Sequence, residues 1–442
     1  MLFSGNGLPV DDDILDRILT FCPTFQTLQS TMITSKSFYR VFQTHPKSIT
    51  RAVAYNAVGP ALPQALRVLR YPYDEYNTPD ADPAAMVEAC EEDHLISVIT
   101  AEEKQKLQEN SRIVVKLENI YSLRHKDRTS KTSLLTSEES WRFQRAMYRI
   151  MLFCNLFPST SYSEDMDDEC IEKIRRQRTA MLKEYPTTEL QELHSVTKFL
   201  QGICEEVAPD ASLVQMLLST GPYGAMTIWE NRSYDTLEED LEFPDFDDDD
   251  VDLKLFSRYF SLPLENIWTM RKVTPPKDED PVSKWILDQV NGANDTCSKC
   301  AAPGGLQLYT EANWDRFPIY LPNLLKHHLK QNSTITQPFY VATAQLAQPE
   351  NLAAFIGDLF SFTTRTSPEF DGWMRTDSYC NACLVKFLEE HLWIWFLDER
   401  IKGGWTPPEN CWYGWNCRTQ VHKRFHAETK NHLCVPIKGD AI

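Results

Sequence analysis

Long apolar runs are missing from this sequence. No segment reaches the roughly 18 to 20 consecutive apolar residues that a membrane-spanning helix needs. The first residues, MLFSGNGLPVDDDILD, contain no positively charged segment followed by an apolar stretch, which is the pattern of a secretory signal. We therefore expect an intracellular protein of the cytoplasm or nucleus that has no membrane partner.

Basic residues are outnumbered, and in one region they are absent. The chain of 442 residues carries a net charge of -18, which argues against a protein that coats nucleic acid through its overall field. Eleven carboxylates and no lysine or arginine lie between Asp235 and Asp252. Like charges at this density resist burial, so we expect a solvated loop there and another acidic loop at about 160–170. A docking strip for a basic partner is the alternative interpretation of the longer run.

Glycine-rich phosphate loops and internal repeats are absent as well. What the sequence does contain is 42% hydrophobic and 11% aromatic residues, which is typical of a chain that folds. Helical periodicity predicts a mainly α fold with little β structure. We expect four parts: a helical hairpin at 1–51, a helical body at 52–290, a metal-binding helical domain at 291–405 and a small tail at 406–442.

The N-terminal part has a clear helical pattern. Apolar residues recur at helical spacing from Ile14 to Leu19, directly after three aspartates that suit a helix N-terminus. A second amphipathic helix is expected from about Thr27 to Phe42, with Pro46 closing the unit. Two short helices alone would bury little surface. The simplest interpretation is therefore the first hairpin of a larger α domain.

The same stretch resembles an F-box in the form common in fungal proteins. The resemblance rests on LP followed by DILDRIL, and on SKSFYRVFQTHPKSI, in about a tenth of the chain. It departs from the family pattern at Phe38 and Ile49, which stand where tryptophans are usual. The resemblance implies binding to the Skp-type adaptor of a cullin ubiquitin ligase. The residues that match the adaptor-packing positions are Leu8, Pro9, Ile14, Leu15 and Ile18.

Closely spaced cysteines occur in the last third of the chain. Cys297 and Cys300 form CSKC, and Cys380 and Cys383 form CNAC. In a reducing compartment such pairs indicate metal ligands rather than disulfides. Two C-x-x-C turns together supply the four thiolates of a tetrahedral zinc site, although about 80 residues separate them. Two unrelated pairs of free thiols are the alternative, and no βαβ pattern supports a thioredoxin-like role.

Between and after these two pairs the pattern is helical. We expect two inserted helices at about 321–330 and 349–362. A longer apolar stripe predicts a helix that begins near Leu384 and ends at Gly403. His391 lies beside this stripe, and we interpret it as a hydrogen-bonded core histidine rather than a metal ligand.

The stretch ENCWYGWNCRTQVHKRFHAETKNHLC combines three cysteines and three histidines. A set of two cysteines and two histidines in this spacing is typical of one structural zinc, which gives about two zinc ions for the chain. The ligands in this interpretation are Cys411, Cys417, His426 and His432. His422 and Cys434 are spare, and either could replace a ligand. A catalytic cysteine–histidine pair is the weaker interpretation, because no third residue or oxyanion donor accompanies it.

This stretch resembles a PBZ finger, the zinc finger that binds poly(ADP-ribose), whose pattern is C-x-F/Y-G-x-x-C followed by two histidines. The resemblance covers about 25 residues and implies the same four ligands. It places Tyr413 where the family has an aromatic that contacts an adenine, with Arg418 as a further contact. The spacing from Cys417 to His426 is longer than the usual form. The alternative is that the aromatics here only pack around the zinc.

These features together predict a non-catalytic adaptor. In this hypothesis the chain is the substrate-recognition subunit of an SCF ubiquitin ligase. It binds the Skp-type adaptor, and through it the cullin, and holds an unknown protein target with its helical and zinc-containing parts. The competing hypothesis is a reader of poly(ADP-ribose) or nucleic acid, in which the hairpin is only structural. A metal-dependent hydrolase is disfavoured, because the sequence shows no Asp, Glu and His cluster with an open coordination site.

Overall fold

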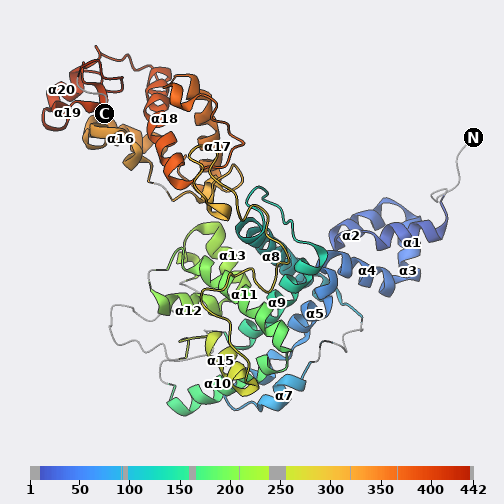
Figure 1. Cartoon of the computed structure of the whole chain (residues 1–442). Coiled ribbons are helices and arrows are strands. Elements are labelled where there is room, and N and C mark those ends of the chain that lie inside the picture. Colours follow the sequence, from blue (N-terminus) through green and yellow to red (C-terminus); the bar gives the residue numbers. More distant parts are fainter. Residues whose placement is uncertain are drawn as a thin grey trace, which may run out of the picture. The chain divides into compact units, whose positions relative to one another are not determined.

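The computed structural model describes residues 10–90, 92, 98–158, 166–208, 210–237, 255–318, 320–365 and 367–438 (Figure 1). It confirms the mainly α fold, because extended pairing within these ranges is limited to three isolated bridges. None of the helices there is long and apolar enough to cross a membrane. The chain folds as two compact units. The N-terminal unit comprises residues 1–121 and 135–289, and the C-terminal unit comprises residues 122–134 and 290–442.

The N-terminal unit consists of helices and one short helical turn. In chain order the elements are α1 (Asp12–Thr20), α2 (Phe25–Thr34), α3 (Lys36–Thr44), α4 (Pro46–Val58), η1 (Gly59–Ala61), α5 (Leu62–Arg70), α6 (Tyr73–Tyr76), α7 (Pro83–Glu88), α8 (Ala101–His125, whose end belongs to the C-terminal unit), α9 (Ser137–Leu156), α10 (Asp168–Lys183), α11 (Thr187–Cys204), α12 (Ala211–Ser219), α13 (Gly221–Asn231) and α15 (Ser261–Arg271).

The two acidic loops expected from the sequence fall largely on residues that are not described. Residues 159–165 and 238–254 lie outside the described ranges. The end of the first expected loop is helical instead: Asp167 caps α10 by accepting a hydrogen bond from the backbone N–H of Cys170 at 2.8 Å. Carboxylates in this position are favourable because they face the positive end of the helix dipole.

The first four helices enclose a small core of their own. Its buried side chains are Leu15, Leu19, Cys22, Leu28, Phe38, Val41, Ile49 and Val53. The prediction of one helix from Thr27 to Phe42 is wrong, because Ser35 interrupts it and caps α3 with its hydroxyl oxygen. Pro46 does not close the unit but starts α4, where the missing N–H of a proline is not needed. This structural unit therefore extends past residue 51.

The core of the N-terminal unit is built around α9. The sequence AMYRIMLFCNLF at 146–157 is apolar nearly all round and predicts a buried helix, and α9 is buried at every residue from Ala146 to Cys154. Pro186 predicts a break between two amphipathic helices, and this is confirmed, since the proline separates α10 from α11. Both predictions depended on local composition, which here agrees with the packing.

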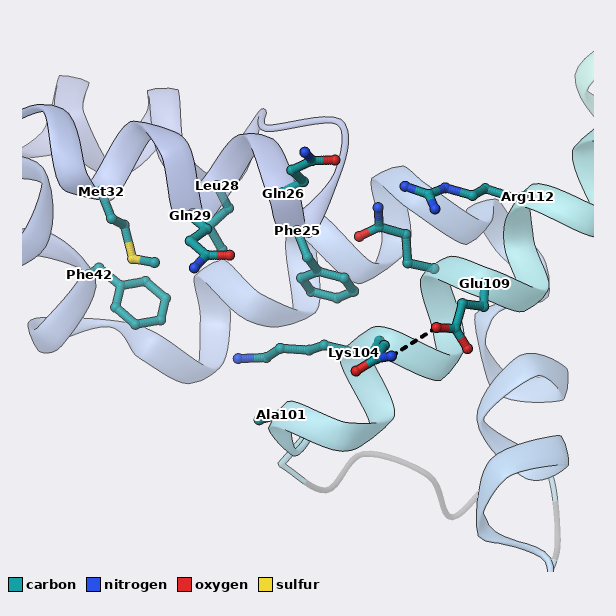
Figure 2. A pocket seen from close by; sticks show the side chains of 12 residues that line it. Phe25, Gln26, Leu28, Gln29, Met32, Phe42, Ala101, Lys104, Glu109 and Arg112 are labelled. Atoms are coloured by element: carbon teal, nitrogen blue, oxygen red, sulfur yellow. Dashed lines mark hydrogen bonds between the residues drawn. The ribbon is translucent and has the colours of Figure 1, made fainter.

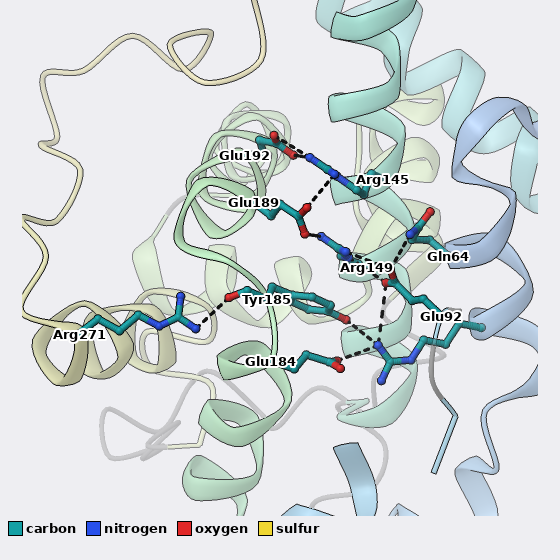
Figure 3. Close-up of polar contacts among 10 residues, drawn as sticks. Gln64, Glu92, Arg145, Arg149, Glu184, Tyr185, Glu189, Glu192 and Arg271 are labelled. Atoms are coloured by element: carbon teal, nitrogen blue, oxygen red, sulfur yellow. Dashed lines mark hydrogen bonds and ion pairs between the residues drawn. The ribbon is translucent and has the colours of Figure 1, made fainter. Parts of the chain in front are cut away.

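Two arginines of α9 lie in a network of ion pairs (Figure 3). Arg145 donates to Glu189 and Glu192 of α11 at 2.8 and 2.6 Å. Arg149 donates to Glu189 at 2.6 Å and to Glu92 at 2.9 Å. Burial acts to raise the pKa of Glu92, but the hydrogen bond and the charge of Arg149 outweigh it and lower that pKa. The network joins α9 to α11, and this structural role accounts for its buried charges.

A histidine on α11 makes the stability of this unit depend on pH. Burial lowers the pKa of His194 to about 4, and the charge of Lys198 adds to the effect. Asp278 and Asp280 act in the opposite direction. The unfolded chain takes up a proton on this side chain near pH 6.5, whereas the folded chain does so only near pH 4. The stabilising contribution is therefore complete above pH 6.5 and is lost as the pH falls from 6.5 to 4.

We expect a His194→Gln variant to be less sensitive to acid than the natural chain. The difference in unfolding free energy between the two should change by up to about 1.4 kcal/mol per pH unit in that window. Urea unfolding at pH 7 and pH 5 measures it, and the comparison cancels acid effects that both chains share. Equal losses of stability in the two chains would show that His194 does not titrate as argued.

The C-terminal unit has a separate core arranged around α18. In chain order its elements are η4 (Gly305–Gln307), η5 (Trp314–Arg316), η6 (Leu321–Leu324), η7 (His327–Gln331), α16 (Ser333–Thr343), α17 (Pro349–Leu359), η8 (Phe360–Arg365), η9 (Pro368–Phe370), α18 (Asn381–Lys402), η10 (Gly414–Asn416), α19 (Thr419–His422) and α20 (Arg424–Thr429). The predicted long helix is α18, which ends at Lys402 and is capped by Gly403. The helix predicted at 321–330 is wrong: two short turns, η6 and η7, replace it, and His327, the first residue of η7, has a left-handed φ of 43°.

Candidate metal centres

Four thiols that are far apart in the sequence meet at the start of α18. The sulfur atoms of Cys297, Cys300, Cys380 and Cys383 all lie within 4.8 Å of one another. The Sγ atoms of Cys300 and Cys380 are 3.6 Å apart. The structure thus brings the two C-x-x-C turns together, and these four residues, the four-thiol cluster, could hold one metal ion.

Backbone hydrogen bonds hold the two turns against each other. Cys297 begins a tight turn in which its N–H donates to the carbonyl of Ala302 at 2.8 Å. The N–H of Ser298 donates to the carbonyl of Ser378 at 2.9 Å. Cys380 is the N-cap residue of α18, so its sulfur lies at the positive end of a long helix. A thiolate is favoured at this position by the helix dipole.

The surroundings of Cys297 also favour a thiolate. Burial acts to raise the pKa of its thiol, but the backbone N–H groups of Cys300, Cys380 and Lys299 outweigh burial and lower the pKa to about 6. The N–H of Cys380 lies 3.3 Å from this sulfur. Donors directed at sulfur stabilise its negative charge, as they do in metal–thiolate sites. The donor set and its backbone therefore suit a divalent metal ion that prefers sulfur.

A buried arginine holds both turns of the four-thiol cluster. Arg128 belongs to residues 122–134, which the sequence placed in the helical body but which are part of the C-terminal unit. Its guanidinium donates to Oδ2 of Asp295 at 2.6 Å and to Oγ of Ser378 at 3.1 Å. Asp295 lies two residues before Cys297, and Ser378 lies two residues before Cys380. Arg128 therefore positions both pairs of ligands from a distant part of the chain.

Replacing Arg128 by alanine is expected to loosen the metal at the four-thiol cluster. Loss of a group that orients metal ligands commonly costs about tenfold or more in metal affinity. With zinc added as the test metal, its transfer to a coloured chelator measures the effect, and release from this cluster should become at least about tenfold faster. Lys131→Ala removes an exposed cation from the same segment and is the matched control. Identical release rates in the two variants would remove the positioning role of Arg128.

The second candidate centre, the Cys2His2 cluster, lies in the tail. Its residues are Cys411, Cys417, His426 and His432, and their ligand atoms lie within 4.8 Å of one another. Nε2 of His426 is 3.4 Å from Sγ of Cys417 and 3.7 Å from Sγ of Cys411. These are the four residues whose spacing in the sequence indicated a metal site.

The environment of His432 shows that this set of ligand atoms suits a metal ion. Its side chain is 1% exposed, and neither ring nitrogen has a hydrogen-bond partner among the described residues. A buried polar group without a partner costs roughly 1 to 3 kcal/mol. Burial, together with the charge of His426, lowers the pKa of His432 to about 4, so the imidazole is neutral and keeps a lone pair. A metal ion at this cluster would satisfy the unpartnered nitrogen.

The C-x-Y-G-x-x-C turn depends on its glycine. Gly414 has a left-handed φ of 43°, and a Cβ atom there would lie 2.1 Å from the carbonyl oxygen of Cys434. The N–H of Cys411 donates to the carbonyl of Asn431 at 2.8 Å, which joins the turn to the segment that carries His432. Any side chain at position 414 would therefore push apart the two segments that supply the ligands.

The other candidate ligands have different roles. Cys434 donates its thiol to the carbonyl of Asn431 at 3.3 Å, and burial raises the pKa of that thiol to about 11. His422 is exposed on α19 and is not part of either cluster. His391 is fully buried, with Nδ1 2.6 Å from the carbonyl oxygen of Phe387. It is the hydrogen-bonded core histidine that the sequence indicated.

The aromatic residues of the CWYGWNC turn divide between core and surface. Trp415 is buried and packs against α18. Tyr413, which matches the adenine-contacting aromatic of the PBZ pattern, and Arg418, the further expected contact, are both exposed. Trp412 is exposed too, and Nζ of Lys438 lies 3.7 Å from the centre of its ring. The turn therefore presents two aromatic rings to solvent, with the cations of Arg418 and Lys438 beside them.

The residues that matched adaptor-packing positions do not share one environment. Ile14 and Ile18 of α1 are 52% and 45% exposed. Leu15 is 1% exposed and belongs to the core of the first four helices, so it does not share the exposed face of Ile14 and Ile18. Phe21, 64% exposed at the end of α1, falls on the same helix face as Ile14 and Ile18 but was not identified from the sequence. The two remaining residues, Leu8 and Pro9, lie outside the described residues.

Comparison of the chain with protein-family models, curated proteins and solved structures gave no match. Each metal cluster offers four protein ligands, which is the arrangement of a closed structural site. A catalytic metal site would instead leave one position open for water or substrate.

Proposed function

We propose that the chain is the substrate-recognition subunit of an SCF ubiquitin ligase and has no catalytic role of its own. In this proposal the F-box-like helices bind the Skp-type adaptor, and the C-terminal unit binds the protein target. The observation that carries the proposal is the exposed apolar face of α1, made of Ile14, Ile18 and Phe21. Apolar side chains gathered on one face of a small helical unit are typical of a protein-binding surface.

The two clusters support a structural use of zinc. Four thiolates, or two thiolates and two imidazoles, are donor sets that zinc takes in closed four-coordinate sites. We therefore assign one zinc ion to each cluster. Zinc at the four-thiol cluster would join the turn at Cys297 to the start of α18, and zinc at the Cys2His2 cluster would hold the tail. With four protein ligands each, neither ion has a free position to activate water, which supports a non-catalytic role.

Co-expression of the full chain with a Skp-type adaptor, followed by metal analysis of the purified sample, tests both parts. We expect a stable complex that contains two zinc ions per copy of the chain. Zinc-loaded chain that does not retain the adaptor would contradict the ligase proposal. A stable complex without zinc would contradict the metal assignment and leave adaptor binding intact.

A second candidate function is a reader of poly(ADP-ribose) or nucleic acid. The observation that favours it is the exposed pair of rings at Trp412 and Tyr413 beside the cations of Arg418 and Lys438. Such rings can stack on bases while nearby cations neutralise phosphates. Zinc without adaptor in the co-expression experiment would make this the leading proposal.

A further inference from the structure

A groove between α2 and α8 in the N-terminal unit has no part in the functions proposed above. It encloses about 470 Å³, which is within the size range of ligand-binding pockets (Figure 2). The exposed residues of α1 that we assign to the adaptor do not line it. The groove therefore needs an explanation of its own.

One side of the groove is apolar. It is lined by Leu28 and by the more accessible side chains of Phe25, Met32 and Phe42. These three are only partly buried against the core of the first four helices. Figure 2 shows them along the groove, opposite α8. Aromatic and methionine side chains in this state are typical of surfaces that receive the apolar side chains of a partner.

The wall formed by α8 carries positive charge. Lys104 extends along the groove beneath Phe25, and Arg112 lies farther along the same helix (Figure 2). Neither side chain forms an ion pair with a residue that the structure describes. Burial lowers the pKa of Lys104, and no neighbouring carboxylate offsets this effect. Glu109 also lines the groove, and its carboxylate accepts a hydrogen bond from Gln105 at 2.9 Å.

Glutamine side chains of both α2 and α8 also line the groove. The amides of Gln26, Gln29 and Gln108 form no hydrogen bond with other described residues. An amide group both donates and accepts, so it can pair with the N–H and the C=O of a peptide backbone. An acyl chain offers neither group. The lining therefore favours a peptide over a fatty acid as the occupant.

We propose that this groove binds a peptide segment of a partner protein in which bulky apolar side chains alternate with Asp or Glu. The apolar side chains pack on Phe25, Met32 and Phe42, and the carboxylates pair with Lys104 and Arg112. Although the chain has a net charge of -18, these two cations form no ion pair with a described residue and lie beside an apolar surface. Their charge therefore complements the carboxylates of such a segment. This binding uses α2, α3 and α8, so it does not depend on adaptor binding by α1.

Fluorescence anisotropy with the full chain tests the proposal. The probe is a short labelled peptide of Leu, Phe and Glu, and the comparison peptide has Lys in place of every Glu. We expect only the Glu peptide to bind the natural chain. The double variant Lys104→Glu/Arg112→Glu should bind the Glu peptide about tenfold more weakly at low ionic strength, and should gain affinity for the Lys peptide.

A charge-matched control shows whether a loss of peptide binding comes from the groove residues or from the changed net charge of the chain. Lys131→Glu/Arg176→Glu reverses two exposed cations that do not line the groove, and it should bind the Glu peptide as the natural chain does. Circular dichroism confirms that both double variants remain folded. Equal binding of the two peptides, or unchanged affinity in Lys104→Glu/Arg112→Glu, would overturn the proposal. Complete displacement of the peptide by dodecanoate, with tighter binding of dodecanoate itself, would show a lipid site instead and would also overturn it.

Discussion

The Cys417→Ser variant is expected to lose one of two zinc ions together with the folded structure of the tail. Sγ of Cys417 lies 3.4 Å from Nε2 of His426, in a cluster that has four ligands. Serine is a poor zinc ligand, so the variant keeps only three. Structural zinc commonly contributes roughly 10 kcal/mol or more to such a module. The helices of the tail, α19 and α20, are very short and add little stability of their own.

Metal analysis and limited proteolysis of the full chain measure the two effects. Cys434→Ser is the matched control, because Cys434 is a buried cysteine of the same tail that lies outside the cluster. Serine at this position can still donate the hydrogen bond that the thiol gives to Asn431. The control should keep both zinc ions and resist proteolysis. Two zinc ions in Cys417→Ser, or one in Cys434→Ser, would mean that the ligand set is wrong.

Replacing Ile14 and Ile18 together by Asp is expected to abolish adaptor binding without unfolding the chain. Both side chains are exposed on α1 and stand outside the core that contains Leu15. Exposed substitutions of this kind change stability little. In a complex, however, each carboxylate would be buried without a partner, at a cost of roughly 2 kcal/mol or more. Two such costs weaken binding about a thousandfold.

Titration of the purified variant with a Skp-type adaptor provides the measurement. Val115→Asp is the control, because Val115 is an exposed apolar residue on α8 of the same unit. It should bind the adaptor with the affinity of the natural chain. If Ile14→Asp/Ile18→Asp also binds normally, the exposed face of α1 is not an adaptor site and the ligase proposal fails. A loss in Val115→Asp as well would point to a general effect of added negative charge rather than to a site.

Features controlled by one or two residues could be predicted from the sequence. The break at Pro186 and the end of α18, which Gly403 caps and after which Gly404 has a left-handed φ of 87°, follow from the backbone properties of proline and glycine. The members of the two metal clusters could also be identified, because close pairs of cysteine and histidine are rare outside metal sites. Proline, glycine and closely spaced cysteine and histidine each have few other roles in these positions, so the sequence alone indicates what they do.

Features that depend on distant contacts could not be predicted. The helical pattern from Thr27 to Phe42 contains no proline or glycine, so its interruption at Ser35 depends on packing within the four-helix core. Helical spacing placed Leu15 in a stripe with Ile18 but did not show which side of the helix faces the core. Arg128 had no local pattern at all, because the residues that it holds are 167 and 250 positions further along the chain.

The distance in sequence between Arg128 and its two partners also fixes the order in which these residues are synthesised. A ribosome adds roughly 5 to 20 residues per second, so Arg128 emerges about 10 to 30 s before Asp295 and longer still before Ser378. During this interval the guanidinium, which is almost fully buried in the finished protein, has neither of its two partners. Residues 122–134 interrupt the N-terminal unit in the sequence, and they can take their final contacts only after the last third of the chain has been made. The helices of the N-terminal unit that precede and follow this segment must therefore fold while it still lacks those contacts.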